Sequence, residues 1–261
     1  MRPLLPVPRM IPCLLLKGEG FYKTTKFREP SYLGDPLNIV RIFNEKEVDE
    51  LCILDITATV VGKKPSFAYL AELAGECFMP LSYGGGITSL EDCKRLFGIG
   101  FEKVIINSAL FSHPDIIERA AGQFGSQSVA ASLDAKKAMF GGYHIWTRSG
   151  TVNTKRGAVN FAREMEAKGA GEILLNAMDR DGTMSGYDEA LVGAVTEAVN
   201  IPVIASGGAA SLADMVNLVR RTNVSAVAAG ALFVYYGPHK AVLINPPTGE
   251  LFRDALRPGI G

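Results

Sequence analysis

Short apolar runs alternate with amphipathic stretches along most of the chain. The apolar runs predict eight strands, at residues 10–16, 51–56, 79–83, 103–107, 128–134, 172–178, 202–206 and 225–229. The amphipathic stretches between them predict seven helices, at residues 36–47, 66–77, 89–100, 113–125, 158–170, 188–199 and 211–222. Strands that alternate with helices are typical of parallel sheets. Eight such strands favour a closed (β/α)8 TIM barrel over an open doubly wound sheet.

The second half of the chain resembles the first. Asp55 and Asp179 follow predicted strands and lie 124 residues apart, and the segment around Leu15 matches the segment around Asp134 at an offset of 119 residues. Self-similarity at a nearly fixed offset is typical of a duplicated architecture. We therefore expect a single domain over residues 1–261, built from two half-barrels that present equivalent sites. One of these sites has Asp134, and the other has Leu15.

Composition narrows the class of protein. The formal net charge is zero and Lys and Arg do not cluster along the sequence, which argues against a nucleic-acid partner. No apolar run approaches the roughly 20 residues that a membrane helix needs, and the first residues lack the pattern of a signal peptide. The four cysteines form no CxxC pair. We therefore expect reduced thiols in a cytoplasmic protein that contacts no membrane and holds neither a metal nor a cofactor.

Two long segments interrupt the regular alternation. Residues 18–35 follow the first predicted strand and residues 136–156 follow the fifth, and we expect both to be loops at the carboxyl-terminal mouth of the barrel. Active sites of such barrels lie at this end, and loops of this length are more often functional than ornamental. Residues 234–261 contain no clear amphipathic helix, so we expect an irregular tail there.

Glycines and small polar residues follow the strands in both halves. Glycine lets the backbone approach an anion closely, and a helix N-terminus adds N–H donors and a favourable dipole. The candidate anion-binding residues are Gly86, Asn107 and Ser108 in the first half, and Asp181, Gly182, Gly208, Gly230 and Ala231 in the second. Two such sets on opposite sides of one mouth suit an elongated, bisphosphorylated small molecule.

Several motifs carry a family resemblance, namely LDITAT, GGGI, INSALF, LDAKK, DRDGTMSGYD, IPVIASGGA and AAGALF. From about residue 9 to residue 233 the chain resembles the cyclase subunit of imidazole glycerol phosphate synthase, from histidine biosynthesis. The resemblance implies a barrel that pairs with a class I glutaminase subunit at its N-terminal face. It also implies that ammonia from this partner crosses the barrel and reacts with a bisphosphorylated, nucleotide-like substrate. The products would be imidazole glycerol phosphate and an aminoimidazole carboxamide ribotide.

The resemblance assigns the acid–base chemistry to two aspartates, at the ends of strands one and five. The second falls on Asp134, but the first falls on Leu15, whose side chain can neither donate nor accept a proton. General acid–base catalysis commonly contributes about 10²–10⁴-fold to a rate. Glu19 lies four residues further on and is a candidate substitute.

Four charged residues stand at the starts of predicted strands and should form one ring at the bottom of the barrel: Arg9, Glu50, Lys103 and Glu172. Residues on this face usually serve stability, and the resemblance implies a further role, a gate through which ammonia enters. Three more residues match polar positions of the family's substrate site: Lys23, Asp55 and Asn176.

Three functions stay open on the sequence alone. The first is a divergent paralogue of the WbuZ-type branch, which accepts ammonia and passes it to a sugar amidotransferase in surface-polysaccharide synthesis. The second is a true cyclase in which another group replaces the missing aspartate, and the third is a sugar-phosphate isomerase on the same half-barrel plan. The retained phosphate motifs favour the cyclase. The loss of one proton carrier favours the paralogue, because it raises the barrier by roughly 3–5 kcal/mol. Since these two observations favour different functions, whether the chain is itself an enzyme stays undecided.

Overall fold

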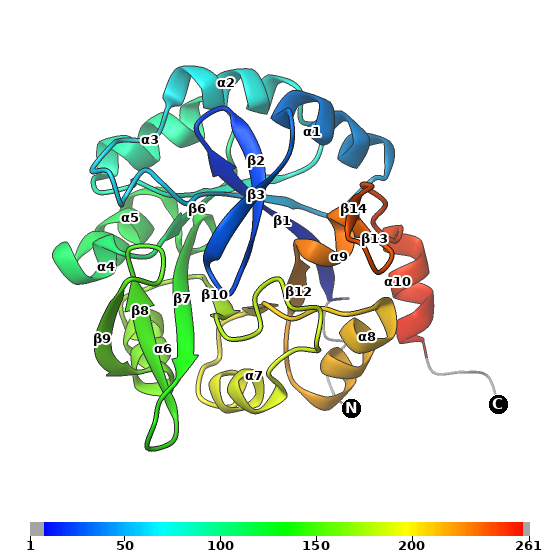
Figure 1. Ribbon diagram of the computed structural model, residues 1–261. Coiled ribbons are helices and arrows are strands. Elements are labelled where there is room, and N and C mark those ends of the chain that lie inside the picture. Colours follow the sequence, from blue (N-terminus) through cyan, green and yellow to red (C-terminus); the bar gives the residue numbers. More distant parts are fainter. Residues whose placement is uncertain (1–7, 258–261) are drawn as a thin grey trace.

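Eight parallel strands close into a barrel in the computed structural model, which describes residues 8–257 (Figure 1). Around the barrel the strands run in the order β1 (Arg9–Lys17), β4 (Leu51–Asp55), β5 (Leu81–Gly84), β6 (Lys103–Ile106), β7 (Val129–Lys137), β10 (Glu172–Ala177), β11 (Val203–Ser206) and β12 (Ala226–Ala229). β12 pairs in parallel with β1 and closes the ring. The predicted (β/α)8 barrel is confirmed.

Helices cover the outside of the barrel, as Figure 1 shows. They are α1 (Pro36–Glu45), α2 (Phe67–Gly75), α3 (Leu90–Gly98), α4 (Ala109–Ser112), α5 (Ile116–Phe124), α6 (Ala158–Ala167), α7 (Glu189–Thr196) and α8 (Leu212–Arg221). All eight predicted strands and all seven predicted helices are present, and their ends shift by at most three residues. Between residues 8 and 257, no helix has the length and apolar character that crossing a bilayer requires.

The two long segments are antiparallel hairpins, so the expectation of loops was wrong. β2 (Gly20–Thr25) and β3 (Arg28–Gly34) extend the end of β1, whereas β8 (Tyr143–Thr147) and β9 (Val152–Gly157) extend the end of β7. The hairpins follow equivalent strands of the two half-barrels, as a duplication predicts. Their backbone groups are paired within the hairpins, and Phe21 of β2 and Ile145 of β8 are fully buried in the core.

The C-terminal segment is also more regular than expected. It forms α9 (Ala231–Val234), a short hairpin of β13 (Tyr235–Tyr236) and β14 (Ala241–Val242), and α10 (Gly249–Leu256). The Thr248 hydroxyl caps α10 by accepting a hydrogen bond from the Leu251 amide, and Phe252 is fully buried where α10 packs near α8 and β1. The prediction of an irregular tail was therefore wrong as far as residue 257. Residues 1–7 and 258–261, which the predicted domain also included, lie outside the described part.

The barrel interior holds a small core of its own. Successive side chains of a strand point to opposite faces, so alternate residues of each strand face inward and the rest pack against the helices. The inward set forms a separate apolar cluster of Ile11, Cys13, Cys52, Ile105, Ala130, Leu174, Ile204, Ala226 and Ala228. This alternation puts Arg9 and Leu15 on one inward-facing row of β1, at the bottom and at the mouth of the barrel.

Candidate functional site at the barrel mouth

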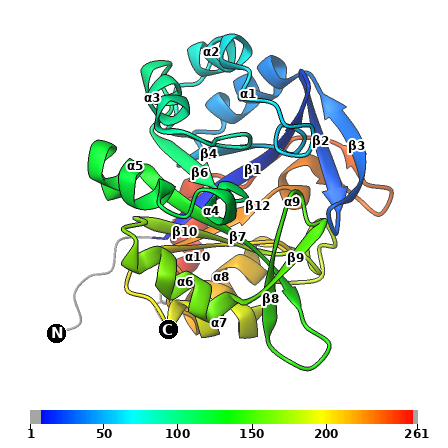
Figure 2. The same ribbon diagram turned by 90° about the vertical axis from the view of Figure 1, so that its left-hand side faces the viewer.

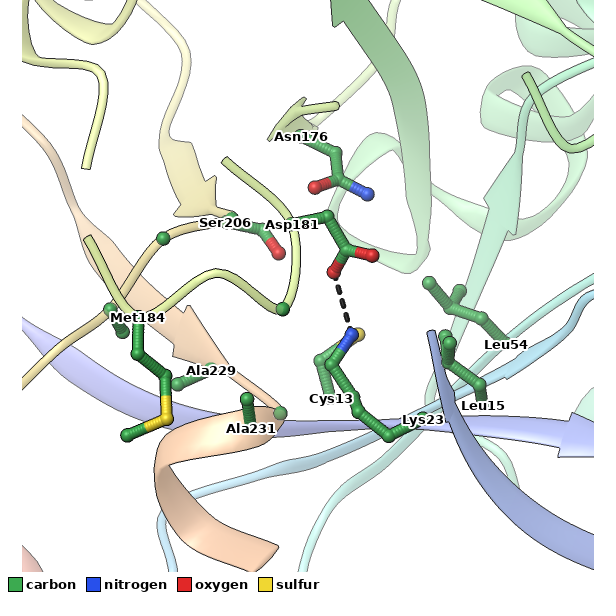
Figure 3. A pocket seen from close by; sticks show the side chains of 15 residues that line it. Cys13, Leu15, Lys23, Leu54, Asn176, Asp181, Met184, Ser206, Ala229 and Ala231 are labelled. Carbon is green, nitrogen blue, oxygen red and sulfur yellow. Dashed lines mark hydrogen bonds and ion pairs between the residues drawn. The ribbon is translucent and has the colours of Figure 1, made fainter. Parts of the chain in front are cut away.

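A pocket lies at the carboxyl ends of the strands (Figure 3). Its lining comes from β1, β2, β4 and the second half-barrel: Cys13, Leu15, Lys23, Leu54, Asn176, Asp181, Gly182, Met184, Ser206, Gly207, Gly208, Ala209, Ala229, Gly230 and Ala231. Leu15 and Leu54 form one apolar side, and the polar side chains of the lining are those of Lys23, Asn176, Asp181 and Ser206. Such a pocket can hold a polar small molecule against one apolar side.

Leu15 forms part of the apolar wall. It pairs in register with Leu54 of β4 and with Tyr22 of β2, and Figure 3 shows Leu15 and Leu54 next to each other on the same side of the pocket. Glu19 does not compensate for the missing carboxylate. Its side chain is exposed in the turn between β1 and β2 and does not line the pocket. The first acid–base position therefore has no proton carrier of its own.

Asp134 is the buried carboxyl of the site. It lies on the inward row of β7, opposite Asn176 of β10, and accepts a hydrogen bond of 3.2 Å from the Asn107 Nδ2 atom. Burial raises the pKa of Asp134 to about 7, the charge of Asp181 adds to this rise, and hydrogen bonds from Asn176 and Asn107 oppose it. A carboxyl with such a pKa can hold or release a proton near neutral pH, as a general acid or base requires.

Lys23 and Asp181 form an ion pair inside the pocket. The Lys23 Nζ atom lies 2.6 Å from the Asp181 Oδ1 atom, and the Thr24 hydroxyl donates to the Asp181 Oδ2 atom at 2.9 Å. The Lys26 amide donates to the Asp181 carbonyl at 2.9 Å. These bonds fasten the β2–β3 hairpin to the segment after β10 and bring Lys23 into the pocket.

Close backbone approach requires glycine at two positions beside this pair. Gly182 has φ +67°, and a Cβ atom there would lie 2.1 Å from the Thr24 carbonyl oxygen. Gly208 has φ +107°, and a Cβ atom there would lie 2.2 Å from the Gly186 carbonyl oxygen. Both glycines thus allow chain segments to touch where a side chain would separate them.

At the opposite end of the barrel the four expected charges form one closed ring. Arg9 is paired with both Glu50 and Glu172, and the Lys103 Nζ atom lies 2.5 Å from a Glu172 oxygen and 3.3 Å from a Glu50 oxygen. Glu50 and Glu172 are buried. We call these four residues the charge ring. It closes the bottom of the barrel directly below the apolar interior.

Two thiols meet inside the barrel between the charge ring and the pocket. Cys13 and Cys52 are register partners on β1 and β4, and their Sγ atoms lie 3.7 Å apart as free thiols. The hydrogen bond to Cys13 and burial raise the pKa of Cys52 well above its usual value. Over residues 8–257, no three His, Cys, Asp or Glu side chains gather in a way that could hold a metal ion.

Comparisons with known proteins bear on this arrangement. Residues 9–240 match the family model described as "Histidine biosynthesis protein". The chain is 53% identical over 239 residues to the "Putative imidazole glycerol phosphate synthase subunit hisF2" of Pseudomonas aeruginosa, covering 92% of this chain and 95% of that protein. This chain belongs to the histidine biosynthesis protein family, as a HisF-type member. The "Putative imidazole glycerol phosphate synthase subunit HisF" of Leptospira borgpetersenii is 47% identical over 252 residues, which cover 96% of this chain and 99% of that protein. The "Putative imidazole glycerol phosphate synthase subunit hisF3" of Vibrio vulnificus is 43% identical over 249 residues, which cover 95% of this chain and 96% of that protein.

The structure gathers only part of the site that the HisF-type resemblance implied. The residues it brings together around the pocket are Leu15, Lys23, Asn176, Asp181, Gly182, Gly208, Gly230 and Ala231. Asp55, Gly86, Asn107, Ser108 and the predicted catalytic residue Asp134 do not line this pocket. The Asp55 carboxylate accepts hydrogen bonds from the Thr57 and Ala58 amides, so it builds the turn after β4. Ser108 donates to the Asn107 Oδ1 atom and accepts from the Arg148 amide.

Sequence reasoning missed other lining residues of this HisF-type barrel, notably Cys13, Leu54, Met184 and Ser206. Cys13 and Leu54 could have been predicted from the alternation of their strands. Cys13 lies two residues before Leu15 on β1, and Leu54 lies two residues after Cys52 on β4, so both face inward. Ser206 is the last residue of β11 and directly precedes Gly207. It was missed because the sequence there was interpreted only as a glycine motif. Met184 reaches the pocket from the irregular segment after β10, for which no periodic signal exists.

Proposed function

We propose that this chain is a HisF-type synthase subunit that receives ammonia from a class I glutaminase through the barrel and supports amidation of a surface-polysaccharide sugar. In this proposal the glutaminase binds the N-terminal face beside the charge ring, and a sugar amidotransferase consumes the ammonia. The observation that carries the proposal is Leu15. The position of one proton carrier is apolar, its neighbour Leu54 is apolar, and Glu19 lies outside the pocket.

The barrel interior suits a small neutral molecule. The column above the charge ring consists of small or apolar side chains, among them Ala130, Ala226 and Ala228, and the thiols Cys13 and Cys52. Ammonium would have to leave water and lose its hydration there, at a high cost, whereas neutral ammonia would not. The pairing within the charge ring lets its members separate and re-form around a passing molecule, since each carboxylate keeps a second cationic partner.

Acid–base chemistry is reduced to one group. Asp134, whose pKa of about 7 follows mainly from burial, can serve as acid or as base, but a ring closure that uses two carriers has lost one of them. That loss corresponds to roughly 3–5 kcal/mol of barrier.

A second candidate function is the cyclase itself, with production of imidazole glycerol phosphate in histidine biosynthesis. The observation that favours it is the Lys23–Asp181 pair, which lies in the pocket together with Leu15. In this alternative the pair replaces the missing aspartate as a proton carrier. The anion-binding glycines and Asp134 would then serve their family roles unchanged.

The test measures cyclase turnover with ammonium chloride and the bisphosphorylated substrate, in the absence of any glutaminase. The proposal predicts turnover at least about 10²-fold below that of a cyclase with both aspartates. Leu15→Asp should raise it, because position 15 lines the pocket and is equivalent to Asp134 in the repeat, whereas the matched control Leu54→Asp should not. Turnover of the unaltered chain at a full cyclase rate, and its loss in Lys23→Met, would instead establish the second candidate.

A further inference from the structure

Two cysteines of the barrel interior lie in contact with each other. Cys13 of β1 and Cys52 of β4 are register partners, and their Sγ atoms lie 3.7 Å apart as free thiols. Both are buried, with exposed fractions of 7% and 3%. A single buried cysteine usually serves as a small apolar side chain. Two thiols in contact form a different group, because together they can be oxidised to a disulfide.

The backbone holds this pair at a spacing that suits a disulfide. Neighbouring strands of a sheet lie about 4.7–4.9 Å apart, and the Cα atoms of a disulfide usually lie about 4.4–6.8 Å apart. Register partners on adjacent strands therefore meet this requirement without a large movement of the main chain. The Sγ atoms would have to approach from 3.7 Å to about 2.05 Å. Rotation of the two side chains can supply this approach, because inward-facing side chains of a barrel converge toward its axis.

One of the two thiols can be reached from the mouth of the barrel. Cys13 belongs to the lining of the pocket, and Figure 3 labels it among the lining side chains. Cys52 is absent from that lining and lies beside Cys13 on the next strand. A small oxidant that enters the pocket would therefore meet Cys13 first. This division suits a pair in which one thiol reacts with the oxidant and the other resolves the product.

The surroundings of the pair determine the order in which the thiols react. The hydrogen bond with Cys13 and burial raise the pKa of Cys52 well above its usual value, so its thiol stays protonated near neutral pH. The thiolate is the reactive form of cysteine, and Cys52 is therefore suited to the second step rather than to the first. Within residues 8–257, no group of three His, Cys, Asp or Glu side chains is placed to hold a metal ion, so the pair is not part of such a group.

We propose that Cys13 and Cys52 are an oxidation site, which forms a reversible disulfide inside the barrel when hydrogen peroxide enters the pocket. The Cys13 sulfur attacks one peroxide oxygen, the O–O bond breaks, and the leaving hydroxide takes the Cys13 proton to form water. The Cys52 sulfur then attacks the sulfenic acid of Cys13, the S–O bond breaks, and a second water leaves with the Cys52 proton. The two thiols lose two electrons and the peroxide gains them. A dithiol such as dithiothreitol reverses the reaction by disulfide exchange.

The bond would tie together the two strands that carry the apolar side of the pocket. On each strand the cysteine lies two residues before the leucine of that side, Leu15 on β1 and Leu54 on β4. Figure 2 shows β1 passing from the barrel into the β2–β3 hairpin, which brings Lys23 into the pocket. Oxidation would therefore fix the base of this hairpin. The reduced pair stays the resting state, as the cysteine pattern of the sequence predicts.

Peptide mapping of the oxidised chain tests this proposal. The folded chain is treated with about 1 mM hydrogen peroxide, the remaining thiols are alkylated in denaturant, and a tryptic digest is analysed without reduction. We expect a linked peptide that joins residues 10–17, which contain Cys13, to residues 47–63, which contain Cys52. Dithiothreitol should abolish it. Cys77 and Cys93 share one tryptic peptide, residues 64–94, so a bond between them cannot be mistaken for the expected one.

Single variants test the order of the two steps. In Cys52→Ser, Cys13 should accumulate as a sulfenic acid that dimedone traps, whereas in Cys13→Ser the Cys52 side chain should stay a thiol. Pure core filling would not produce this difference. The matched controls Cys77→Ser and Cys93→Ser should leave the yield of the linked peptide unchanged. Thermal unfolding shows whether each variant is folded, and Cys52→Ala serves if the buried hydroxyl of Cys52→Ser prevents folding.

Oxidation should also raise the Tm of the unaltered chain by at least about 4 °C, because the bond joins residues 39 apart in the sequence. Three outcomes would overturn the proposal. The first is the absence of the linked peptide from the oxidised, folded chain. The second is a sulfenic acid on Cys52 in Cys13→Ser and none on Cys13 in Cys52→Ser, and the third is a fall in Tm on oxidation, because the barrel would then not accommodate the bond. None of these outcomes depends on the nitrogen acceptor, so a failure here leaves the proposed function standing.

Discussion

Removing Lys103 tests how the charge ring holds the bottom of the barrel. In Lys103→Met the Nζ atom that lies 2.5 Å from Glu172 and 3.3 Å from Glu50 disappears. Both carboxylates are buried, and each keeps only its contact with Arg9. Breaking a buried ion pair by removal of one partner costs about 3–5 kcal/mol. Because Arg9 still contacts both carboxylates, we expect the low end of that range, about 3 kcal/mol.

Thermal unfolding measures this loss directly. For a chain of this size, about 3 kcal/mol corresponds to a fall in Tm of about 6–12 °C. The matched control is Arg221→Met, which removes the cation of the exposed ion pair with Glu189 and should change stability by less than about 1 kcal/mol. If Lys103→Met and Arg221→Met lower the Tm equally, the contacts of Lys103 in the charge ring do not stabilise the barrel.

Three further predictions follow from the site and the C-terminal helix. Asp181→Asn should lower the pKa of Asp134 from about 7, because the charge of Asp181 contributes to raising that pKa. Carbon NMR titration of the Asp134 carboxyl measures this change, and an unchanged pKa would refute the coupling between the two carboxylates. Because the pKa of Asp134 is raised in the folded state, its contribution to stability is present below about pH 4 and is lost as the pH rises through about 7. The free energy of unfolding, from urea denaturation at pH 5 and pH 8, should therefore fall more over this interval in the unaltered chain than in Asp134→Asn, and parallel curves would contradict this. Phe252→Ala should cost about 3–5 kcal/mol in the same assay, since this fully buried ring docks α10 on the barrel; a loss below about 1 kcal/mol would show that α10 is not needed.

The barrel was predictable because its strands and helices carry strong periodic signals. The inward row of β1, from Arg9 to Leu15, and the matching row of β7 alternate with residues that pack under the helices. The positions at the bottom and at the mouth of the barrel therefore follow from the sequence, whereas the register between strands was not predicted. The charge ring was predictable for the same reason, since each member immediately precedes or begins a strand.

The hairpins and α10 could not be predicted, for physical reasons. Most of β3 is exposed, so its strand conformation comes from pairing with β2 and leaves no apolar alternation in the sequence. α10 follows Pro246 and Pro247 and is only eight residues long, so it depends on the docking of Phe252 more than on its own propensity. The function of Asp55 was also hidden, because its carboxylate bonds to amides two and three residues on.

The origin and destination of one nitrogen atom distinguish ammonia transfer to a sugar from cyclisation. The chain, its glutaminase and a sugar amidotransferase would be combined with amide-labelled ¹⁵N-glutamine, the sugar acceptor and the bisphosphorylated cyclase substrate, and the products analysed by mass spectrometry. If ammonia passes through the barrel to the sugar, ¹⁵N appears in the amidated sugar, in amounts that fall when Lys103→Met replaces the unaltered chain, and none appears in imidazole glycerol phosphate. Labelled imidazole glycerol phosphate formed at a cyclase rate, with an unlabelled sugar, would contradict it.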